Sequence, residues 1–276
     1  MRIALCNEVI AELPFERQCA LARELGYDGL EVAPYTLAED PTRLTQTERA
    51  GLRRTAAEAG IAIAGLHYLM RAPAGLSITT RDDAARARTV EVMRALCGLA
   101  ADLGAGVLVH GSPDQRQLEA GDEADGRRRA AACFAAAAAE AETVGVTYCV
   151  EALSPHQTNF INTVEEAAGI VREICSPALT TMIDCSAAGL AEAEPVPDLI
   201  RRWLPTGLIG HIHFNDPNRR GPGDGALAFA PILAALKDGG YAGDAAVEPF
   251  VYEPDGPGCA ARNIAHLRAI LARLPA

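Results

Sequence analysis

Four segments decide the fold of this chain: VTYCVEAL (146–153), LTTMIDCS (179–186), LIGHIHFND (208–216) and DAAVEPF (244–250). Each contains a short apolar run rich in β-branched residues, which is typical of a buried strand. Each run then reaches a carboxylate or an imidazole, in the order Glu151, Asp184, His213 and Glu248. In a parallel α/β barrel, the carboxyl ends of all strands open on one mouth. We therefore expect these four side chains to meet at a single site.

The same alternation of strands and helices runs through the whole chain. Strand-like runs occur near residues 2–6, 29–33, 61–66, 106–110, 146–151, 179–184, 208–214 and 244–249, with helical patterns between them. Strands that alternate with helices indicate βαβ units and a parallel sheet. A (β/α)8 barrel takes about 250 residues, so a chain of 276 residues fits one such domain. The predicted fold is α/β, a single (β/α)8 TIM barrel over residues 1–276.

Local signals place the helices and loops. Pro14 and Gly26 bracket one helix, since proline suits a first turn and glycine suits the residue after the last turn. Asn162, followed by Glu165, predicts the N-cap of another helix. The alanine-rich run 131–142 predicts an outer helix packed closely on its strand. Irregular stretches that follow strands form the loops of the catalytic face in such barrels. Here they are residues 67–84, 111–122 and 214–227.

The composition argues against several classes of function. The net charge is −11 and no block of Lys or Arg occurs, whereas a nucleic-acid surface requires a basic stripe. No apolar stretch approaches the ~20 residues of a membrane span, and the N-terminus, MRIALCNEVI, lacks a signal-peptide pattern. The eight Cys residues include no C-x-x-C pair. Reduced, buried thiols in a cytoplasmic protein are therefore expected.

The four strand-end side chains are candidate metal ligands. They supply three carboxylates and one imidazole, from Glu151, Asp184, His213 and Glu248. This hard, mostly oxygen donor set suits Mn²⁺ or Mg²⁺ better than a metal that prefers thiolates, with Zn²⁺ or Co²⁺ as alternatives. A carboxylate at the end of a buried strand costs free energy unless it is paired or metal-bound. The alternative is a metal-free polar network.

Other polar residues follow strands. His67 and His110 end predicted strands in GLHYL and LVHGS, and they are expected to line the substrate pocket or to help bind a second metal. A buried structural histidine is the alternative for each. His211 shares a strand face with His213. We expect it to support that ligand or to pack inside the barrel. Arg219 lies in the loop HFNDPNRRGPGDG, where it is expected to clamp a hydroxyl-rich or anionic substrate. The alternative is a solvated loop arginine.

The motifs resemble those of the xylose isomerase-like TIM-barrel superfamily of sugar isomerases and epimerases. The resemblance extends along the whole chain and is closest to the branch with D-tagatose 3-epimerase and D-psicose 3-epimerase. The segments that carry it are VEALSPHQTNFINTVEEA (150–167), MIDCS (182–186), GHIHFNDPNRRGPGDG (210–225) and LKDGGYAGDAAVEPF (236–250). The last two, in this order, are fairly specific for the superfamily, but they do not specify one substrate.

The resemblance implies a divalent-metal enzyme acting on a small-molecule sugar. The family's metal ligands correspond to Glu151, Asp184, His213 and Glu248. Glu151 and Glu248 would also form the acid/base pair: one removes a proton beside a ketone, and the other returns it on the opposite face through an enediolate. Residues expected to contact substrate are His67, His110, Gln157 and Arg219. Homodimers or homotetramers are common among the members.

Two positions depart from the ketohexose epimerases of the family. Ala187 stands where those enzymes carry a histidine, and Gln157 stands where they carry a glutamate. Both changes remove substrate contacts and leave the metal ligands intact. The metal chemistry is therefore better supported than a free ketohexose as substrate. The expected function is isomerisation or epimerisation of a sugar or polyol ketone.

Three other functions stay open from the sequence. A lyase or dehydratase, of the inosose-dehydrating or C-glycoside-cleaving type, would form the same enediolate and then expel a leaving group. The chain also resembles endonuclease IV, whose histidine ligands on strands 3 and 4 correspond to His67 and His110. However, other ligands of that enzyme are missing, and the acidic charge disfavours DNA. A non-catalytic sugar-binding barrel is the third alternative.

Overall fold

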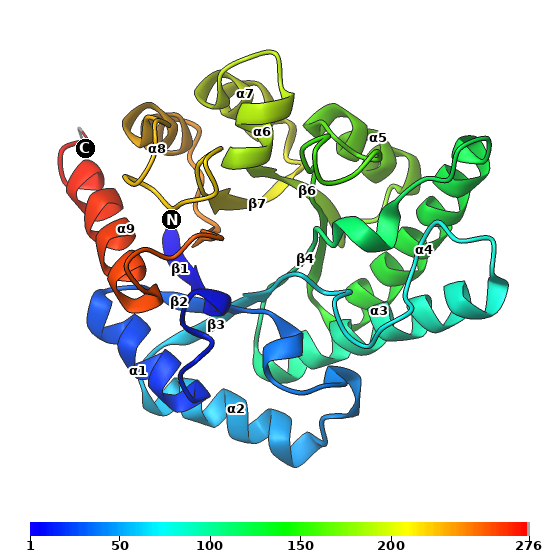
Figure 1. Ribbon diagram of the computed structural model, residues 1–276, viewed down its shortest axis with the longest axis horizontal. Helices are drawn as coiled ribbons and strands as arrows, with labels where there is room; N and C mark the ends of the chain where they lie inside the picture. Colours follow the sequence, from blue (N-terminus) through cyan, green and yellow to red (C-terminus); the bar gives the residue numbers. More distant parts are fainter. Residues whose placement is uncertain (275–276) are drawn as a thin grey trace.

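The computed structural model describes residues 1–274, and its centre is a closed barrel of eight parallel strands (Figure 1). The strands are β1 (Arg2–Cys6), β2 (Gly29–Val32), β3 (Ala62–Leu66), β4 (Val107–His110), β5 (Thr147–Val150), β6 (Leu179–Asp184), β7 (Ile209–Phe214) and β8 (Asp244–Val247). β8 pairs with β1, with Val247 opposite Leu5, and this pairing closes the sheet. The TIM-barrel prediction is confirmed, and each predicted strand ends within two residues of the observed one.

An outer layer of helices surrounds the barrel. The α-helices of the described residues are α1 (Phe15–Leu25), α2 (Gln46–Glu58), α3 (Asp83–Leu103), α4 (Glu123–Val144), α5 (Val164–Ile174), α6 (Cys185–Ala191), α7 (Val196–Trp203), α8 (Phe229–Asp238) and α9 (Gly256–Leu271). Short 3₁₀ turns are η1 (Asn7–Ile10), η2 (Pro34–Thr36), η3 (Pro41–Arg43), η4 (Pro113–Arg116) and η5 (Leu204–Thr206). The C-terminal helix α9 packs beside α1 and so completes the ring (Figure 1).

The helix ends follow local chemistry, with one correction. α1 begins after Pro14 and ends at Gly26, whose φ of 92° is left-handed and suits glycine. The predicted N-cap at Asn162 is wrong, because the cap of α5 is the next residue, Thr163. The Thr163 hydroxyl accepts the backbone N–H of Glu166, and that glutamate accepts the backbone N–H of Asn162. The pair resembles a capping box, except that the glutamate accepts the N–H of the residue before the N-cap.

The alanine-rich segment forms part of α4, as predicted. Ala137, Ala138 and Ala141 are buried on its inner face. Their small side chains let α4 approach the barrel and its neighbour α3 closely, so the run contributes to the core. Alanine also has the highest helix propensity. Low complexity here reflects packing in a helical layer.

Side-chain alternation along each strand decides which residues face the barrel interior. On β4, Val107 and Val109 pack inside the barrel with Cys149 of β5 and Met182 of β6. The remaining β4 residues, including His110, therefore face outward toward the helices. By the same alternation Asp184 lies two residues after Met182 and faces inward, at the carboxyl end of β6.

Two further predictions concern disulfide bonds and membrane-spanning helices. All eight Cys carry free thiols, and all but Cys175 are buried, as expected from their spacing. Among residues 1–274, no helix has the length and apolar character needed to span a bilayer.

Candidate active site

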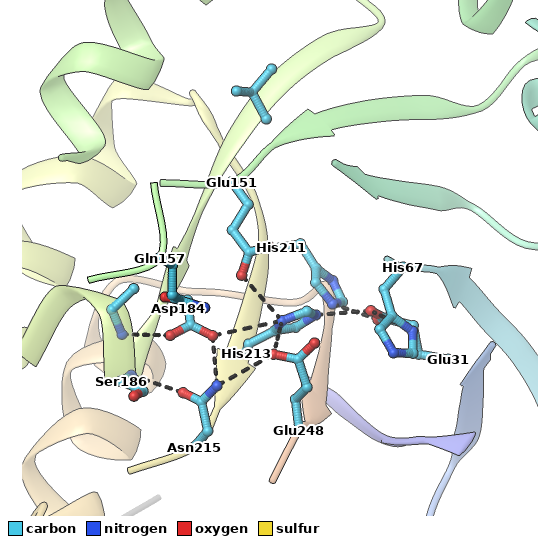
Figure 2. Close-up of polar contacts among 12 residues, drawn as sticks. Glu31, His67, Glu151, Gln157, Asp184, Ser186, His211, His213, Asn215 and Glu248 are labelled. Carbon is cyan, nitrogen blue, oxygen red and sulfur yellow. Dashed lines mark hydrogen bonds and ion pairs between the residues drawn. The ribbon is translucent and has the colours of Figure 1, made fainter. Parts of the chain in front are cut away.

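Four side chains converge at the carboxyl end of the barrel. Glu151 follows β5 directly, Asp184 ends β6, His213 lies in β7 and Glu248 follows β8. One ligand atom from each lies within 4.8 Å of all the others. The Nδ1 atom of His213 lies 3.0 Å from Glu248 Oε2, 3.6 Å from Glu151 Oε1 and 3.8 Å from Asp184 Oδ2 (Figure 2). The structure thus brings together the four residues predicted to bind metal.

The electrostatics of this cluster favour a bound cation. All four residues are buried. Within residues 1–274, each of the three carboxylates has His213 as its ion-pair partner. Burial, together with the charges of Glu151 and Glu248, raises the pKa of Asp184 to about 8. Burial opposes the charged form of His213, but Glu248 and the other carboxylates raise its pKa well above the usual value. A divalent ion would relieve the repulsion among the carboxylates.

Polar groups around the cluster orient two of the carboxylates. Asn215 Nδ2 donates to Asp184 Oδ2 at 2.6 Å and approaches Glu248 Oε2 at 3.3 Å. The backbone N–H of Ser186 donates to Asn215 Oδ1, which fixes which end of the amide faces the carboxylates. The backbone N–H of Ala187 donates to Asp184 Oδ1 at 2.6 Å. One oxygen of Asp184 is therefore held by the start of α6 and the other by Asn215.

Sequence reasoning missed a fifth carboxylate, Glu31 of β2. It is fully buried, and its Oε1 lies 2.8 Å from His213 Nε2, at hydrogen-bond distance. Burial opposes its charge, but the imidazoles of His211 and His213 hold its pKa well below the ordinary value. The available signal was a glutamate inside the apolar strand GLEV, where an unpaired charge would be costly.

A cavity of about 780 Å³ opens above the cluster. Among the residues that line it are Glu8, Tyr35, Tyr68, Arg71, Ser112, Asp114, Glu151, Ser154, His156, Gln157, Asp184, Ser186, Leu190, Asn215, Pro217, Arg219, Glu248 and Phe250. Most of them lie on the loops that follow the strands, as expected for the catalytic face of a barrel. The size suits a small organic ligand. The cavity thus gives a substrate direct access to three of the four cluster residues.

One wall of the cavity combines charge and aromatic surface. The Tyr35 hydroxyl donates to Glu8 Oε1, and the other Glu8 oxygen lies 2.7 Å from His67 Nε2. The guanidinium of Arg71 lies 5.0 Å from the centre of the Tyr35 ring and 5.5 Å from that of Tyr68. Sequence analysis assigned no role to Glu8 or to these tyrosines. They lie on the loops after β1, β2 and β3, where the motifs gave no signal.

Two predicted substrate contacts line the cavity. The Gln157 side chain folds back so that its Oε1 accepts the Ser154 hydroxyl at 3.0 Å. Arg219 adopts a left-handed φ of 69°, and its guanidinium lies 5.5 Å from the centre of the Phe250 ring. Its carbonyl accepts the N–H groups of Phe250 and Val251. The loop after β7 is thereby tied to the loop after β8, with the arginine at the cavity.

The two strand-end histidines have different surroundings, and His67 belongs to two groups of side chains that could hold a metal ion. His67 is buried beneath the cavity wall, where it pairs with Glu8 and makes an edge contact with the His213 ring. His110 lies outside the site: its Nδ1 bonds the Tyr148 hydroxyl at 2.7 Å, and its ring packs on Phe134 of α4. The expectation that His110 contacts substrate or metal is therefore corrected, because it faces away from the barrel interior. None of the potential metal-ligand groups within residues 1–274 contains it.

Comparisons with known proteins agree with this geometry. Residues 19–270 match the family described as "Xylose isomerase-like TIM barrel". The L-ribulose 3-epimerase of Mesorhizobium japonicum is 29% identical over 247 residues, which cover 88% of this chain and 78% of that protein. The D-psicose 3-epimerase of Agrobacterium fabrum is 32% identical over 111 residues, 40% of this chain and 37% of that one.

The architecture agrees as well. A solved structure of an L-ribulose 3-epimerase superposes with a TM-score of 0.82 at 26% identity, covering 98% of this chain and 94% of that chain. The family match spans nearly the whole barrel and confirms the resemblance that the motifs suggested. The chain is an enzyme, and it belongs to the xylose isomerase-like TIM-barrel family.

Proposed function

We propose that the protein is a divalent-metal-dependent isomerase or epimerase that transfers a proton beside the carbonyl group of a sugar or polyol ketone. The observation that carries the proposal is the convergence of Glu151, Asp184, His213 and Glu248 at the base of a cavity. The two sequence relatives, an L-ribulose 3-epimerase and a D-psicose 3-epimerase, support the same class of substrate and reaction.

The donor set fits a hard divalent cation. Asp184, Glu151 and Glu248 offer carboxylate oxygens, and His213 offers Nδ1, all within 4.8 Å of one another. Mn²⁺ and Mg²⁺ prefer such oxygen-rich sites. When bound there, the ion would polarise the substrate carbonyl and stabilise the negative charge that develops on its oxygen. Because Nε2 of His213 is engaged by Glu31, Nδ1 is the nitrogen that would be available to the ion.

Glu151 and Glu248 are suited to transfer the proton. They follow β5 and β8, the outer two of the four strands that carry the cluster. A sugar carbon between them is therefore reached from two sides. One glutamate, as carboxylate, removes the proton beside the carbonyl and leaves an enediolate; the other, as carboxylic acid, returns a proton to the opposite face. The two residues exchange protonation states in each turnover.

The cavity wall would bind the rest of the substrate. Gln157 and Arg219 line it and are proposed to hydrogen-bond substrate hydroxyl groups. Glu8 is a further acceptor on the opposite wall. His67 would act through Glu8, because it lies behind that carboxylate.

Hydrogen exchange tests the proposal. Metal-free protein, with and without added Mn²⁺ or Mg²⁺, is incubated in D₂O with L-ribulose, D-psicose and a panel of polyol ketones. We expect metal-dependent uptake of deuterium at one carbon, together with an isomer of the substrate. The Glu248→Gln variant is the matched control and should show no exchange. A product that has lost water would identify a dehydratase instead, and no exchange with any compound would contradict the proposal.

A further inference from the structure

The carboxylate of Glu31 lies against the His213 ring, on the side opposite Glu151 and Asp184 (Figure 2). Glu31 is 0% exposed and belongs to β2, which β1 and β8 separate from β7 in the barrel. Its Oε1 is 2.8 Å from His213 Nε2, whereas His213 Nδ1 is 3.0 Å from Glu248 Oε2. The imidazole therefore connects Glu31 to the metal-ligand cluster, although Glu31 itself faces no substrate.

We propose that Glu31 is a positioning residue of the metal centre, which keeps the His213 proton on Nε2 and so presents an unprotonated Nδ1 to the cation. The inference rests on the metal-dependent function proposed above. A neutral imidazole has one N–H donor and one lone pair. In the opposite tautomer, a lone pair would face the Glu31 carboxylate and an N–H would face the cation. Both contacts would be repulsive, so the carboxylate selects the binding tautomer.

A glycine of β3, Gly65, lies beside Glu31 in the barrel. The register of β2 on β3 shifts between Leu30 and Glu31, so that Glu31 lies opposite Gly65. A Cβ at residue 65 would lie 2.7 Å from Val107 Cγ1 and 3.4 Å from Glu31 Cγ. The irregularity leaves the extra residue, Ala64, on β3 and not on β2. Gly65 is required first by Val107 of β4, and the Glu31 stem packs beside the same position at ordinary contact distance.

The surroundings of Glu31 also restrict its orientation. Its Oε2 lies 2.7 Å from His211 Nε2, without the alignment of a hydrogen bond. His67 Nδ1 lies 3.7 Å from its Oε1. Within residues 1–274, Glu31 therefore has three imidazoles as ion-pair partners. Of these three, His213 is the one whose geometry is that of a hydrogen bond. A carboxylate that only balanced the charge of nearby histidines would not need this alignment.

Metal affinity measures the proposed role without any substrate. The dissociation constant of Mn²⁺ is measured by the EPR signal of free Mn²⁺, in the wild-type protein and in Glu31→Gln. We expect the affinity of Glu31→Gln to be about 10- to 100-fold lower, the effect typical of losing a carboxylate partner of a ligating histidine. An Asp122→Asn variant removes the same charge from a carboxylate that pairs with Arg81 and Arg129 instead, away from the metal-ligand cluster. Its affinity should change much less.

Two more measurements separate positioning from charge. Glu31→Asp keeps the charge but shortens the side chain, so its Mn²⁺ affinity should also fall, and it carries the test if Glu31→Gln does not fold. At a Mg²⁺ concentration that just saturates the wild type, ¹⁵N NMR should find the His213 proton on Nε2 alone, whereas in Glu31→Gln part of the His213 population should carry a proton on Nδ1. Wild-type affinity in Glu31→Gln, or full affinity in Glu31→Asp, would overturn the inference. If the wild type itself binds no divalent metal, the proposed function fails first.

Discussion

Arg116 donates a hydrogen bond of 2.6 Å from its Nη1 to the backbone carbonyl of Glu151. The guanidinium comes from η4, after β4, and is completely buried. Burial lowers the pKa of Arg116 to about 10, although the nearby charges of Glu151 and Glu166 favour its protonated form. It thus remains a cation at neutral pH. The backbone of a proposed catalytic residue is fixed by a buried charge that belongs to a neighbouring loop.

Replacing this side chain should destabilise the protein and disturb the site. Arg116→Met leaves the buried Glu151 carbonyl without its donor, which costs about 1–3 kcal/mol of unfolding free energy. Urea unfolding measures the loss, and the rate of substrate deuterium exchange should fall with it. Arg128→Met is the matched control, since Arg128 is exposed and pairs with Asp125 on the surface of α4. Its unfolding free energy should change by about 0.5 kcal/mol or less. Equal effects of the two substitutions would contradict the assigned role.

Neutralising either proposed acid/base residue should remove catalysis while the fold remains. Glu151→Gln and Glu248→Gln each keep the side-chain volume but cannot accept a proton. We expect each to lower the exchange rate by about 10²–10⁴-fold, the usual contribution of a positioned proton-transfer group. The rates are measured at saturating Mn²⁺, so that weaker metal binding does not account for the loss. Near-normal rates in both variants would rule out this acid/base pair.

The ligand cluster was predictable from the sequence because each member ends an apolar run of a strand. Glu151, Asp184, His213 and Glu248 lie at the same end of adjacent strands of a parallel barrel, and this arrangement depends only on topology. Glu31 was missed because its strand, GLEV, is short and comes early in the chain, apart from the four segments that carry the cluster. Its pairing with His213 joins two strands that β8 and β1 separate, and the sequence pattern of one strand does not predict such a contact.

The error at His110 has a related cause. Strands of a parallel barrel are buried on both faces, so an apolar run such as VLV does not reveal which residues point inward. The packing of Val107 and Val109 inside the barrel settles the question, and it places His110 among the helices. The one-residue error at Asn162 arose because Asn162 and Thr163 are both good N-caps. The backbone of Thr163 and its bond to the Glu166 N–H decide between them.

Metal binding should depend on pH in a definite direction. In the metal-free protein, burial and the charges of Glu151 and Glu248 raise the pKa of Asp184 to about 8. A metal ligand must be deprotonated, so binding releases a proton below that pH. We therefore expect the affinity for Mn²⁺ to rise as the pH increases from 6.5 to 8. Isothermal titration calorimetry in buffers with different ionisation enthalpies should detect the released proton, and a pH-independent affinity would contradict the raised pKa.

His110 should make the folded protein less stable in acid and should have no part in catalysis. Burial, followed by the charge of Arg116, lowers the pKa of His110 to about 3, below the ordinary value near 6.5. Between these values the unfolded chain binds the proton more readily, so this group makes the wild type lose stability as the pH falls from 6.5 toward 3. His110→Gln removes this titrating group, so the unfolding free energy of the variant should depend less steeply on pH between 6.5 and 3. At pH 7 the variant should lose about 1 kcal/mol with the bond to Tyr148, while its exchange rate at saturating metal stays at the wild-type level. A large loss of exchange in a folded His110→Gln protein would instead return this histidine to the active site.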